Sequence, residues 1–500
     1  MNPLYRLLIG GAVVVAALVL LLPGSNPAGG DEAGQLSLYC AAGLRKPVEE
    51  IANRYFEEQG VRIDIQYGGS NTLLGQMEVG KTGDLYLAAD ESYLDIARSK
   101  GLVEETIPLA KMVPVVVVPR ENEAIVDSVD DLLNLRLAAA NPDQAAVGKA
   151  TRQQLQAAGV WEAFDEAVRD RGVYKPTVGD VANDVALGAV DAGVVWDAVA
   201  GHYPQLRTIR LPELESQPVK VAVGVLASAE EPAAALRFAR YLAAADRGLP
   251  VLESAGFDAV EGDPWFEKPE VSVFAGAVNR QALQPVLDRF AEREGVAINT
   301  VYNGCGILNA QMDSLGPGHD LFPDAYMPCD RYYLGEVQPL FEAGRDVSST
   351  PIVIVVAKGN PKAIATLDDL AKPGVRVALG QPEQCTIGVL SRKLLEDYGL
   401  YEQLLAENVV TQTTSSSLLV PAVATGAADA TLAYATDARG ESAKVEAVAI
   451  GSPLARAVQQ FSAAKSTPHK RLIGRMRQTL LASPEVFTGL GFLWEVKADQ

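Results

Sequence analysis

The sequence predicts an α/β protein in which one fold occurs twice in tandem along a chain of 500 residues. The main observation is an internal repeat with offsets of 235, 240 and 238 residues, seen in segments 55–61 and 290–296, 141–148 and 381–388, and 188–191 and 426–429. Because the offset changes by only a few residues, the repeat is a duplicated domain and not a solenoid, whose period is roughly 20–50 residues.

The second observation is that strands and helices alternate within each copy, which is typical of an α/β fold with crossover helices. In the first copy the expected elements are a strand at 36–39, a helix at 47–59 that ends before Gly60, a strand at 61–67 and a Gly/Ser-rich turn at 68–72 leading into a second helix. A strand, a turn of this kind and a helix direct several N–H donors at one spot. The apolar runs at 113–118 and 352–356 are expected to be buried parallel strands.

The N-terminus carries an uncharged apolar run at 7–22, preceded by Arg6 and followed by Pro23. Its 16 residues are fewer than the roughly 20 of a membrane-spanning helix and suit the apolar region of an export signal. The alternative is an uncleaved N-terminal membrane anchor. We therefore expect a periplasmic or extracytoplasmic protein, which is membrane-anchored if the segment is not cleaved. The chain divides into a signal or anchor with its linker (1–30), a first domain (31–260), a linker (261–269) and a second domain (270–500).

The formal net charge of −20 argues against a nucleic-acid partner, because the phosphate backbone would be repelled. It does not exclude a small anion, which backbone N–H groups and helix N-termini can hold locally. The only histidines are His202, His319 and His469, and their spacing matches no histidine metal motif. The sequence therefore favours a binding protein over an enzyme.

The motifs of the first copy, taken in order, resemble the periplasmic molybdate- or tungstate-binding proteins of ABC transporters, within the type II solute-binding proteins. The residues that carry the resemblance are 39–44, 69–73, 83–90, 115–119, 141–143 with Gly148, 188–196 and 253–257. The resemblance implies two tandem bilobal domains, each with two Rossmann-like lobes joined by a hinge. It implies that a tetrahedral oxyanion is enclosed between the lobes and that the partner is an ABC permease.

Carried over from the family, the oxyanion-binding positions of the first copy are Gly43, Ser70, Ala146, Val147, Val181 and Trp196. Two of them depart from the family pattern, because Gly43 stands where a serine is expected and Trp196 where a tyrosine is expected. Ser70 has a second interpretation as a helix N-cap, a common role for a serine before a helix. In the second copy Tyr434 supplies the tyrosine that the first copy lacks.

The second copy places cysteines at three positions expected to lie on cleft loops: Cys305 corresponds to Ser70, Cys329 to Ala89 and Cys385 to Ala145. Three thiolates suit a soft metal or metalloid such as Cu(I), Zn(II), an iron–sulfur cluster or trivalent arsenic, and no other cofactor is expected. The alternatives are a disulfide, for instance between Cys305 and Cys385, simple packing, or an oxyanion held by N–H groups with the thiols incidental. The corresponding alternative function is a tandem sensor or scavenger, or a redox or metal protein. Cys40 is expected to be a small buried apolar residue.

Overall fold

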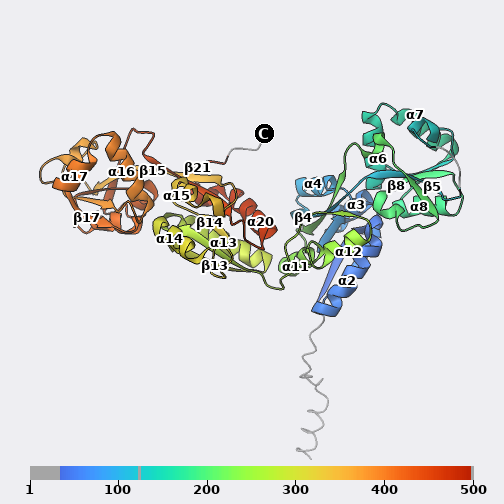
Figure 1. Ribbon diagram of the computed structural model, residues 1–500, viewed down its shortest axis with the longest axis horizontal. Coiled ribbons are helices and arrows are strands. Elements are labelled where there is room, and N and C mark those ends of the chain that lie inside the picture. The colour runs from blue at the N-terminus through green and yellow to red at the C-terminus, as the bar shows by residue number, and fades with distance from the viewer. Residues whose placement is uncertain (1–33, 122–125, 497–500) are drawn as a thin grey trace, which may run out of the picture.

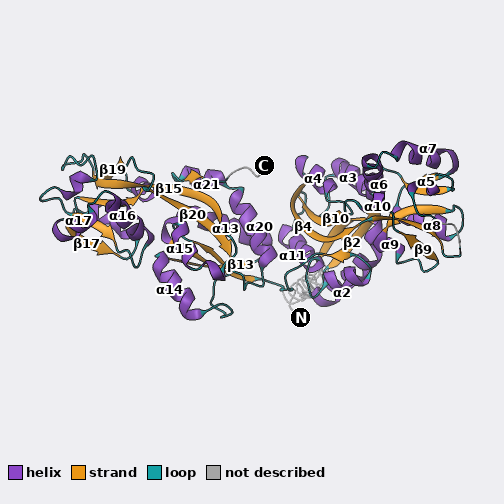
Figure 2. Ribbon diagram, turned by 45° about the horizontal axis from the view of Figure 1, so that its top comes forward, coloured by secondary structure: helices purple, strands orange, loops and turns teal. Residues whose placement is uncertain are grey.

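The computed structural model describes residues 34–121 and 126–496, so the expected export signal or anchor at 1–30 lies outside the described residues. Four α/β lobes lie in a row, two for each copy of the repeat (Figures 1 and 2). Within the described ranges, no helix combines the length and the apolar character needed to cross a membrane.

The first lobe is built on a six-stranded mixed sheet with the order β11-β4-β10-β3-β1-β2. Its strands are β1 (Gln35–Ala41), β2 (Arg62–Gly68), β3 (Leu85–Ala88), β4 (Val103–Met112), β10 (Val219–Leu226) and β11 (Asp258–Ala259). Its helices are α2 (Arg45–Gln59), α3 (Ser70–Gly80), α4 (Ser92–Ser99), α11 (Pro232–Leu242) and α12 (Gly248–Ser254). β1 pairs in parallel with β2 and β3, whereas β10 is antiparallel to β3 and β4.

Helix α2 shows how the local sequence produces these elements. Val48, Ile51, Ala52 and Tyr55 recur at helical spacing and form its buried face. The helix ends where Gly60 adopts a left-handed backbone with φ of 70°, a conformation that glycine reaches without strain. The helix expected at 47–59 is therefore confirmed, with a start two residues earlier.

The second lobe of the first domain has its own five-stranded sheet, ordered β7-β6-β8-β5-β9. The strands are β5 (Pro114–Pro119), β6 (Leu137–Ala140), β7 (Val173–Lys175), β8 (Ala192–Trp196) and β9 (Leu206–Ile209). The helices are α5 (Val129–Leu132), α6 (Ala146–Ala157), α7 (Trp161–Arg171), α8 (Val178–Ala186), α9 (Asp197–Ala200) and α10 (Pro212–Glu215). The chain enters this lobe between β4 and β5 and returns to the first lobe through β10, so two crossing segments connect the lobes.

The second copy repeats this plan in a ten-stranded assembly, because its crossing strand is continuous. The strands are β12 (Glu270–Gly276), β13 (Ala297–Asn303), β14 (Ala325–Met327), β15 (Arg345–Ala357), β16 (Val377–Gly380), β17 (Val409–Thr413), β18 (Ala430–Tyr434), β19 (Val445–Ala449), β20 (Arg456–Ala463) and β21 (Leu493–Trp494). β15 pairs with β20 along its first half and with β18 and β19 along its second half. It therefore runs through both lobes.

The helices of the second copy are α13 (Arg280–Glu294), α14 (Cys305–Leu315), α15 (Arg331–Glu336), α16 (Thr386–Asp397), α17 (Tyr401–Glu407), α18 (Leu419–Ala424), α19 (Ala435–Gly440), α20 (Lys470–Leu481) and α21 (Pro484–Gly489). The two copies are thus tandem bilobal α/β domains with a hinge between their lobes, which confirms the predicted fold class.

One detail of the expected topology is wrong. The apolar runs at 113–118 and 352–356 fall in β5 and β15, whose described pairings are all antiparallel. These strands enter the second lobe from the first, and therefore run against the strands that begin within the second lobe. Apolar composition indicates burial on both faces but does not give strand direction.

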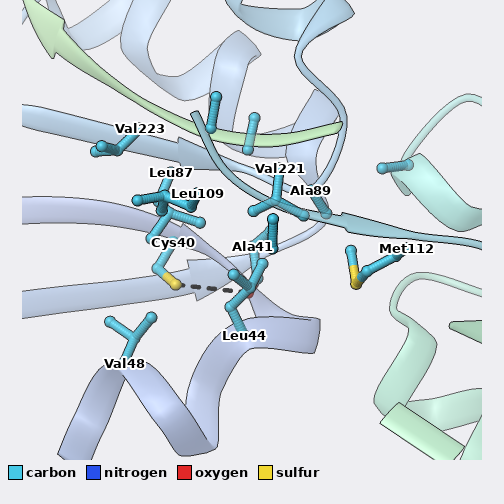
Figure 3. Packing of buried hydrophobic residues seen from close by; sticks show 14 of the residues in the cluster. Cys40, Ala41, Leu44, Val48, Leu87, Ala89, Leu109, Met112, Val221 and Val223 are labelled. Carbon is cyan, nitrogen blue, oxygen red and sulfur yellow. Dashed lines mark hydrogen bonds between the residues drawn. The ribbon is translucent and has the colours of Figure 1, made fainter. Parts of the chain in front are cut away.

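The core of the first lobe confirms the expectation for Cys40. Figure 3 shows this residue packed near Leu44, Val48 and Leu87, with its sulfur directed at the carbonyl oxygen of Ala41, 3.5 Å away. Cys40 is fully buried, and burial raises the pKa of its thiol. It acts as a small apolar residue.

The two domains contact each other through their first lobes, where α11 packs against α13 (Figure 1). Glu294, at the end of α13, is 1% exposed and receives a 2.8 Å hydrogen bond from Arg240 of α11. Arg475 of α20 donates two further bonds to the same carboxylate, at 2.6 and 3.0 Å. Two arginines hold the pKa of Glu294 below its ordinary value although burial opposes this. The buried carboxylate of Glu294 is thus paired with one arginine from each domain.

Candidate functional site

A small cavity of about 20 Å³ lies between the two lobes of the first domain, at the point where several loops and helix starts meet. It is lined by Ala41, Ala42, Gly43, Gly68, Gly69, Ser70, Ala89, Ala145, Ala146, Val147, Thr177, Val178 and Trp196. Every one of these side chains is uncharged. The cavity therefore brings together five of the six positions predicted for the first copy, namely Gly43, Ser70, Ala146, Val147 and Trp196.

Two helices begin at this cavity without a side-chain cap. Helix α3 starts at Ser70 after Gly69, and α6 starts at Ala146 after Ala145, and neither preceding residue makes a capping hydrogen bond. The first N–H groups of a helix have no acceptor within the helix, so they remain available as donors. Helix dipoles add positive potential at the same place. The arrangement attracts an anion without any charged side chain.

Ser70 is not the N-cap of α3, because it is the first helical residue and Gly69 holds the capping position. Its Oγ instead accepts a hydrogen bond of 3.3 Å from the N–H of Ala89, at the end of β3. The Oη of Tyr86 donates to the Ser70 carbonyl at 2.7 Å. The hydroxyl is thus held on the cavity wall by groups from the neighbouring strand, and the alternative interpretation as a cap is wrong.

Val181 does not line the cavity. It is fully buried about one turn further along α8, and the cavity is lined instead by the residues that start this helix, Thr177 and Val178. The Thr177 hydroxyl accepts from the N–H of Asp180 at 3.3 Å and donates to its carboxylate at 2.6 Å. The signal for this helix start is the Thr-x-x-Asp spacing, a capping pattern.

The two departures from the family pattern are spatially linked. A Cβ atom on Gly43 would lie 3.2 Å from Val178 and 3.4 Å from the indole Cδ1 of Trp196. A side chain at position 43 would therefore press on Val178 and touch the indole of Trp196, so the two positions are neighbours on the cavity wall. The side chain of Trp196, at the end of β8, is 1% exposed.

The lobes of the first domain are in contact across the cavity mouth. The N–H of Asn71 donates to the carbonyl of Gln144 at 3.1 Å, and its side-chain amide donates to the carbonyl of Asp143 at 2.7 Å. Lys149 of α6 reaches across to Asp90, with 3.5 Å between Nζ and the carboxylate, and also hydrogen-bonds the Ser92 hydroxyl. The structure thus shows a closed arrangement of the lobes.

The second domain carries the same local geometry with sulfur in place of oxygen. Cys305 is the first residue of α14, and its Sγ accepts a 3.2 Å hydrogen bond from the N–H of Cys329. This contact reproduces the one between Ser70 and Ala89. The sulfurs of Cys305 and Cys329 are 3.3 Å apart, and the thiol of Cys385 donates to the carbonyl of Thr413 at 3.6 Å. The disulfide suggested between Cys305 and Cys385 is wrong for this structure, in which all four cysteines are free thiols.

The first two thiols form a coupled pair. Burial opposes ionisation of Cys305, but hydrogen bonds from the thiol and N–H of Cys329 lower the pKa of Cys305 below its ordinary value. The same hydrogen bond and burial raise the pKa of Cys329. In the described part of the chain, no group of three or more His, Cys, Asp or Glu side chains lies close enough to hold a metal ion. The three-thiolate metal site at Cys305, Cys329 and Cys385 therefore stays a prediction, with only two of its thiols in direct contact.

Tyr434 lies beside these thiols. It ends β18, as Trp196 ends β8, and its ring is fully buried. Its Oη has no hydrogen-bond partner among the described residues, and burial together with the nearby thiols raises its pKa. The hydroxyl of Tyr434 is therefore buried near the thiols and has no partner in the described part of the chain.

A model of one protein family matches the chain twice, at residues 36–258 and 271–487. The chain belongs to the bacterial extracellular solute-binding proteins. The two matches cover both bilobal domains, and membership places the protein outside the cytoplasm. Solute binding, and not catalysis, is the activity of this family.

Relatives with more specific names match between about a quarter and a half of this solute-binding protein. The molybdate-binding protein ModA of Mycobacterium tuberculosis is 28% identical over 257 residues, which are 49% of this chain and 94% of the relative. ModA of Escherichia coli is 30% identical over 140 residues, covering 26% of this chain and 54% of the relative. The structure of the periplasmic molybdate-binding protein of Azotobacter vinelandii aligns with a TM-score of 0.39 and 21% identity, over 44% of this chain and 98% of that one.

Proposed function

We propose that the first domain binds a tetrahedral oxyanion, molybdate or tungstate, in its interlobe cavity. The single observation that supports this most is the convergence of two uncapped helix N-termini, α3 and α6, on a cavity without charged walls. The donors would be the N–H groups of Ser70, Ala146 and Val147 and the Ser70 hydroxyl, with Gly43 and Trp196 completing the wall.

Uncharged donors suit this task because they supply directed hydrogen bonds without an ion pair. An anion buried among N–H groups gains charge-assisted bonds, which are shorter and about twice as strong as neutral ones. A helix N-terminus adds the dipole, whose favourable interaction with an anion is about 0.3–1 kcal/mol at exposed sites and up to ~2 kcal/mol in buried ones. Release of a doubly charged ligand remains possible because no fixed positive charge holds it.

Binding requires the lobes to separate and close again. The cavity of about 20 Å³ has room for about one water molecule, and a tetrahedral oxyanion is larger. An anion that contacts both α3 and α6 makes its full set of bonds only when the lobes meet, so its binding favours the closed state.

The names of the relatives support the choice of ligand and partner. Two relatives are named as molybdate-binding proteins; one matches 49% of the chain and the other 26%. We infer a non-enzymatic role in which the protein, outside the cytoplasm and either free in the periplasm or held by its N-terminal segment, delivers the oxyanion to an ABC permease. As part of this proposal, the first domain spans residues 31–260 and the second 270–500, with 261–269 as their linker.

The test is calorimetric titration of the purified protein with molybdate, tungstate, sulfate and phosphate, repeated on the variant Ala146→Pro. Position 146 is the first residue of α6, where proline fits the helix and only the N–H is lost. Ala145 already has an extended backbone, which a following proline prefers. The matched control is Thr386→Pro, the same change at the first residue of α16 in the second domain.

We expect molybdate and tungstate to bind to the unchanged protein and to Thr386→Pro with equal affinity. Loss of one hydrogen bond to a charged ligand, about 1.5–3 kcal/mol, should weaken binding to Ala146→Pro roughly 10- to 150-fold. Equal losses in both variants would place the anion elsewhere. Absence of heat with all four anions would contradict the proposed function.

A further inference from the structure

The cleft of the second domain contains a compact thiol pair whose surroundings the oxyanion function does not use. Cys305 is fully buried and Cys329 is 4% exposed, and their sulfurs are 3.3 Å apart. Gly276, at the end of β12, packs directly over both, since a Cβ atom there would lie 2.2 Å from one sulfur and 2.9 Å from the other. The pair therefore needs glycine at this position, and it occupies the place that Ser70 and Ala89 hold in the first domain.

Three buried hydroxyls lie near the pair and have no partner other than the thiols among the described residues: Tyr326 Oη, Thr386 Oγ1 and Tyr434 Oη. Tyr326 and Thr386 lie near enough to Cys305 to help lower the pKa of its thiol. Thr386 begins α16, which has no side-chain cap, so the second domain also directs helix N–H groups at this spot. These hydroxyls are therefore placed to donate hydrogen bonds to a ligand bound at the thiols.

Without movement of the thiols, the sulfur separation fits some soft ligands better than others. Two bonds of about 2.3 Å to sulfurs that lie 3.3 Å apart meet at roughly 90°. A tetrahedral centre with such bonds separates its sulfurs by about 3.8 Å, and a linear one by about 4.6 Å. An angle near 90° suits a three-coordinate pyramidal centre instead.

The available donors lead to the same ligand class. Zinc in a structural site takes four nitrogen, sulfur or carboxylate ligands. The described residues offer no cluster of three such side chains in this cleft. A trivalent metalloid can instead use two thiols and keep an oxygen of its own as the third ligand.

We propose that the second domain binds trivalent arsenic, taken up as its neutral trihydroxide, through Cys305 and Cys329. The two thiols displace two hydroxides: two sulfur–arsenic bonds form, two arsenic–oxygen bonds break, and each thiol proton leaves with a hydroxide as water. No electron is transferred. The remaining arsenic hydroxyl takes hydrogen bonds from Tyr434, Thr386 and the helix N–H groups.

This second site is independent of oxyanion binding in the first domain. A thiolate at Cys305 would occupy the donors that an oxyanion would need, and no cysteine is among the described residues that line the cavity of the first domain. The lobes of the second domain must open to admit the metalloid, since the thiols are buried and Tyr333 of the first lobe hydrogen-bonds the Pro382 carbonyl of the second lobe at 3.2 Å.

The test is titration of the reduced protein with sodium arsenite under anaerobic conditions, on the unchanged protein and on Cys305→Ser, Cys329→Ser and Cys385→Ser. We expect one equivalent to bind to the unchanged protein. Because a chelate gains about 10²- to 10⁴-fold over a single contact, loss of either paired thiol should weaken binding at least ~100-fold. Cys385→Ser is the matched control, a buried cysteine of the same cleft, and should bind within about threefold of the unchanged protein.

X-ray absorption at the arsenic edge tests the unchanged protein directly, whatever the stability of the variants. Two sulfur neighbours and one oxygen are expected. Three sulfur neighbours, or equal losses in Cys385→Ser, would overturn the two-thiol site. A Cys305–Cys329 disulfide in protein purified without reductant, or unchanged arsenite affinity in Cys305→Ser, would overturn the proposal, whereas molybdate binding in the same samples reports separately on the first domain.

Discussion

Lys149 of α6 holds the two lobes of the first domain together, and Lys149→Met should speed the release of molybdate. Its ammonium lies 3.5 Å from the Asp90 carboxylate and 4.5 Å from the centre of the Tyr93 ring, and it hydrogen-bonds the Ser92 hydroxyl. All three partners belong to the first lobe. Methionine keeps the length and apolar stem of the side chain but removes the charge and the donors.

The free energy that the Lys149 contact contributes to lobe closure is estimated from the burial of its charged groups. The two charged side chains are 17% and 10% exposed, so water screens their pairing less than that of a surface pair, which contributes ~0.2–1 kcal/mol. A hydrogen bond from a charged donor contributes about 1.5–3 kcal/mol. These contributions overlap, and we take about 1.5–3 kcal/mol for the whole contact. If the contacts exist only in the closed state, closure becomes roughly 10- to 150-fold less favourable.

The assay is stopped-flow dissociation of molybdate, followed by tryptophan fluorescence because Trp196 lines the cavity. The dissociation rate constant should rise about tenfold or more in Lys149→Met. Lys393→Met is the control, since Lys393 lies 4.2 Å over the Tyr332 ring in the second domain and does not touch the first cavity. Dissociation from Lys149→Met at the rate of the unchanged protein, or at the rate of the control, would refute the reasoning.

Two further predictions concern buried carboxylates. Glu294→Gln leaves Arg240 and Arg475 without their shared carboxylate, and urea unfolding should show a loss of about 3–5 kcal/mol; a loss below ~1 kcal/mol would contradict a stabilising role at the domain contact. Burial raises the pKa of Asp437 to about 6, so folding favours its protonated form. Its contribution is complete below about pH 4 and is lost as the pH rises through 6. Asp437→Asn should therefore stabilise the protein at pH 7.5 by at most about 3 kcal/mol and have little effect at pH 4; equal effects at both pH values would contradict this assignment.

The repeat explains why much of the cleft could be predicted from the sequence. Ser70 and Cys305 both begin the helix after the second strand of their copy, and Ala145 and Cys385 both precede the corresponding later helix. Such positions depend on local chain order, which an alignment of the two copies preserves. The sequence therefore identified the loops that meet at the cleft.

Side-chain direction could not be read in the same way. Cys305 contacts Cys329 and not Cys385, because the hydrogen bond from the Cys329 N–H draws its sulfur toward β14. Val181 and Val178 lie on the same helix, and which of them faces the cavity depends on how α8 packs against β8. The spacing of residues in the sequence does not predict this packing.

Contacts between segments far apart in the chain could not be predicted from the sequence either. Lys149 and Asp90 are 59 positions apart and meet only because the lobes close. Glu294 ends a helix in a segment whose sequence suggests exposure. Nothing in that segment indicates that the side chain is buried between Arg240 and Arg475. Their pairing follows from the packing of α11 and α20 around α13.

The most direct measurement of the central claim is the number of molybdate ions bound per chain, by equilibrium dialysis followed by molybdenum analysis. Because the first cavity combines free helix N–H groups with the Ser70 hydroxyl, and the second cleft places thiols at the corresponding positions, we expect one ion per chain, and a clearly smaller fraction bound to Ala146→Pro at the same free concentration. Two ions per chain would show that the cysteine cleft also accepts the oxyanion, and none in the unchanged protein would show that the first domain does not; either result contradicts the account.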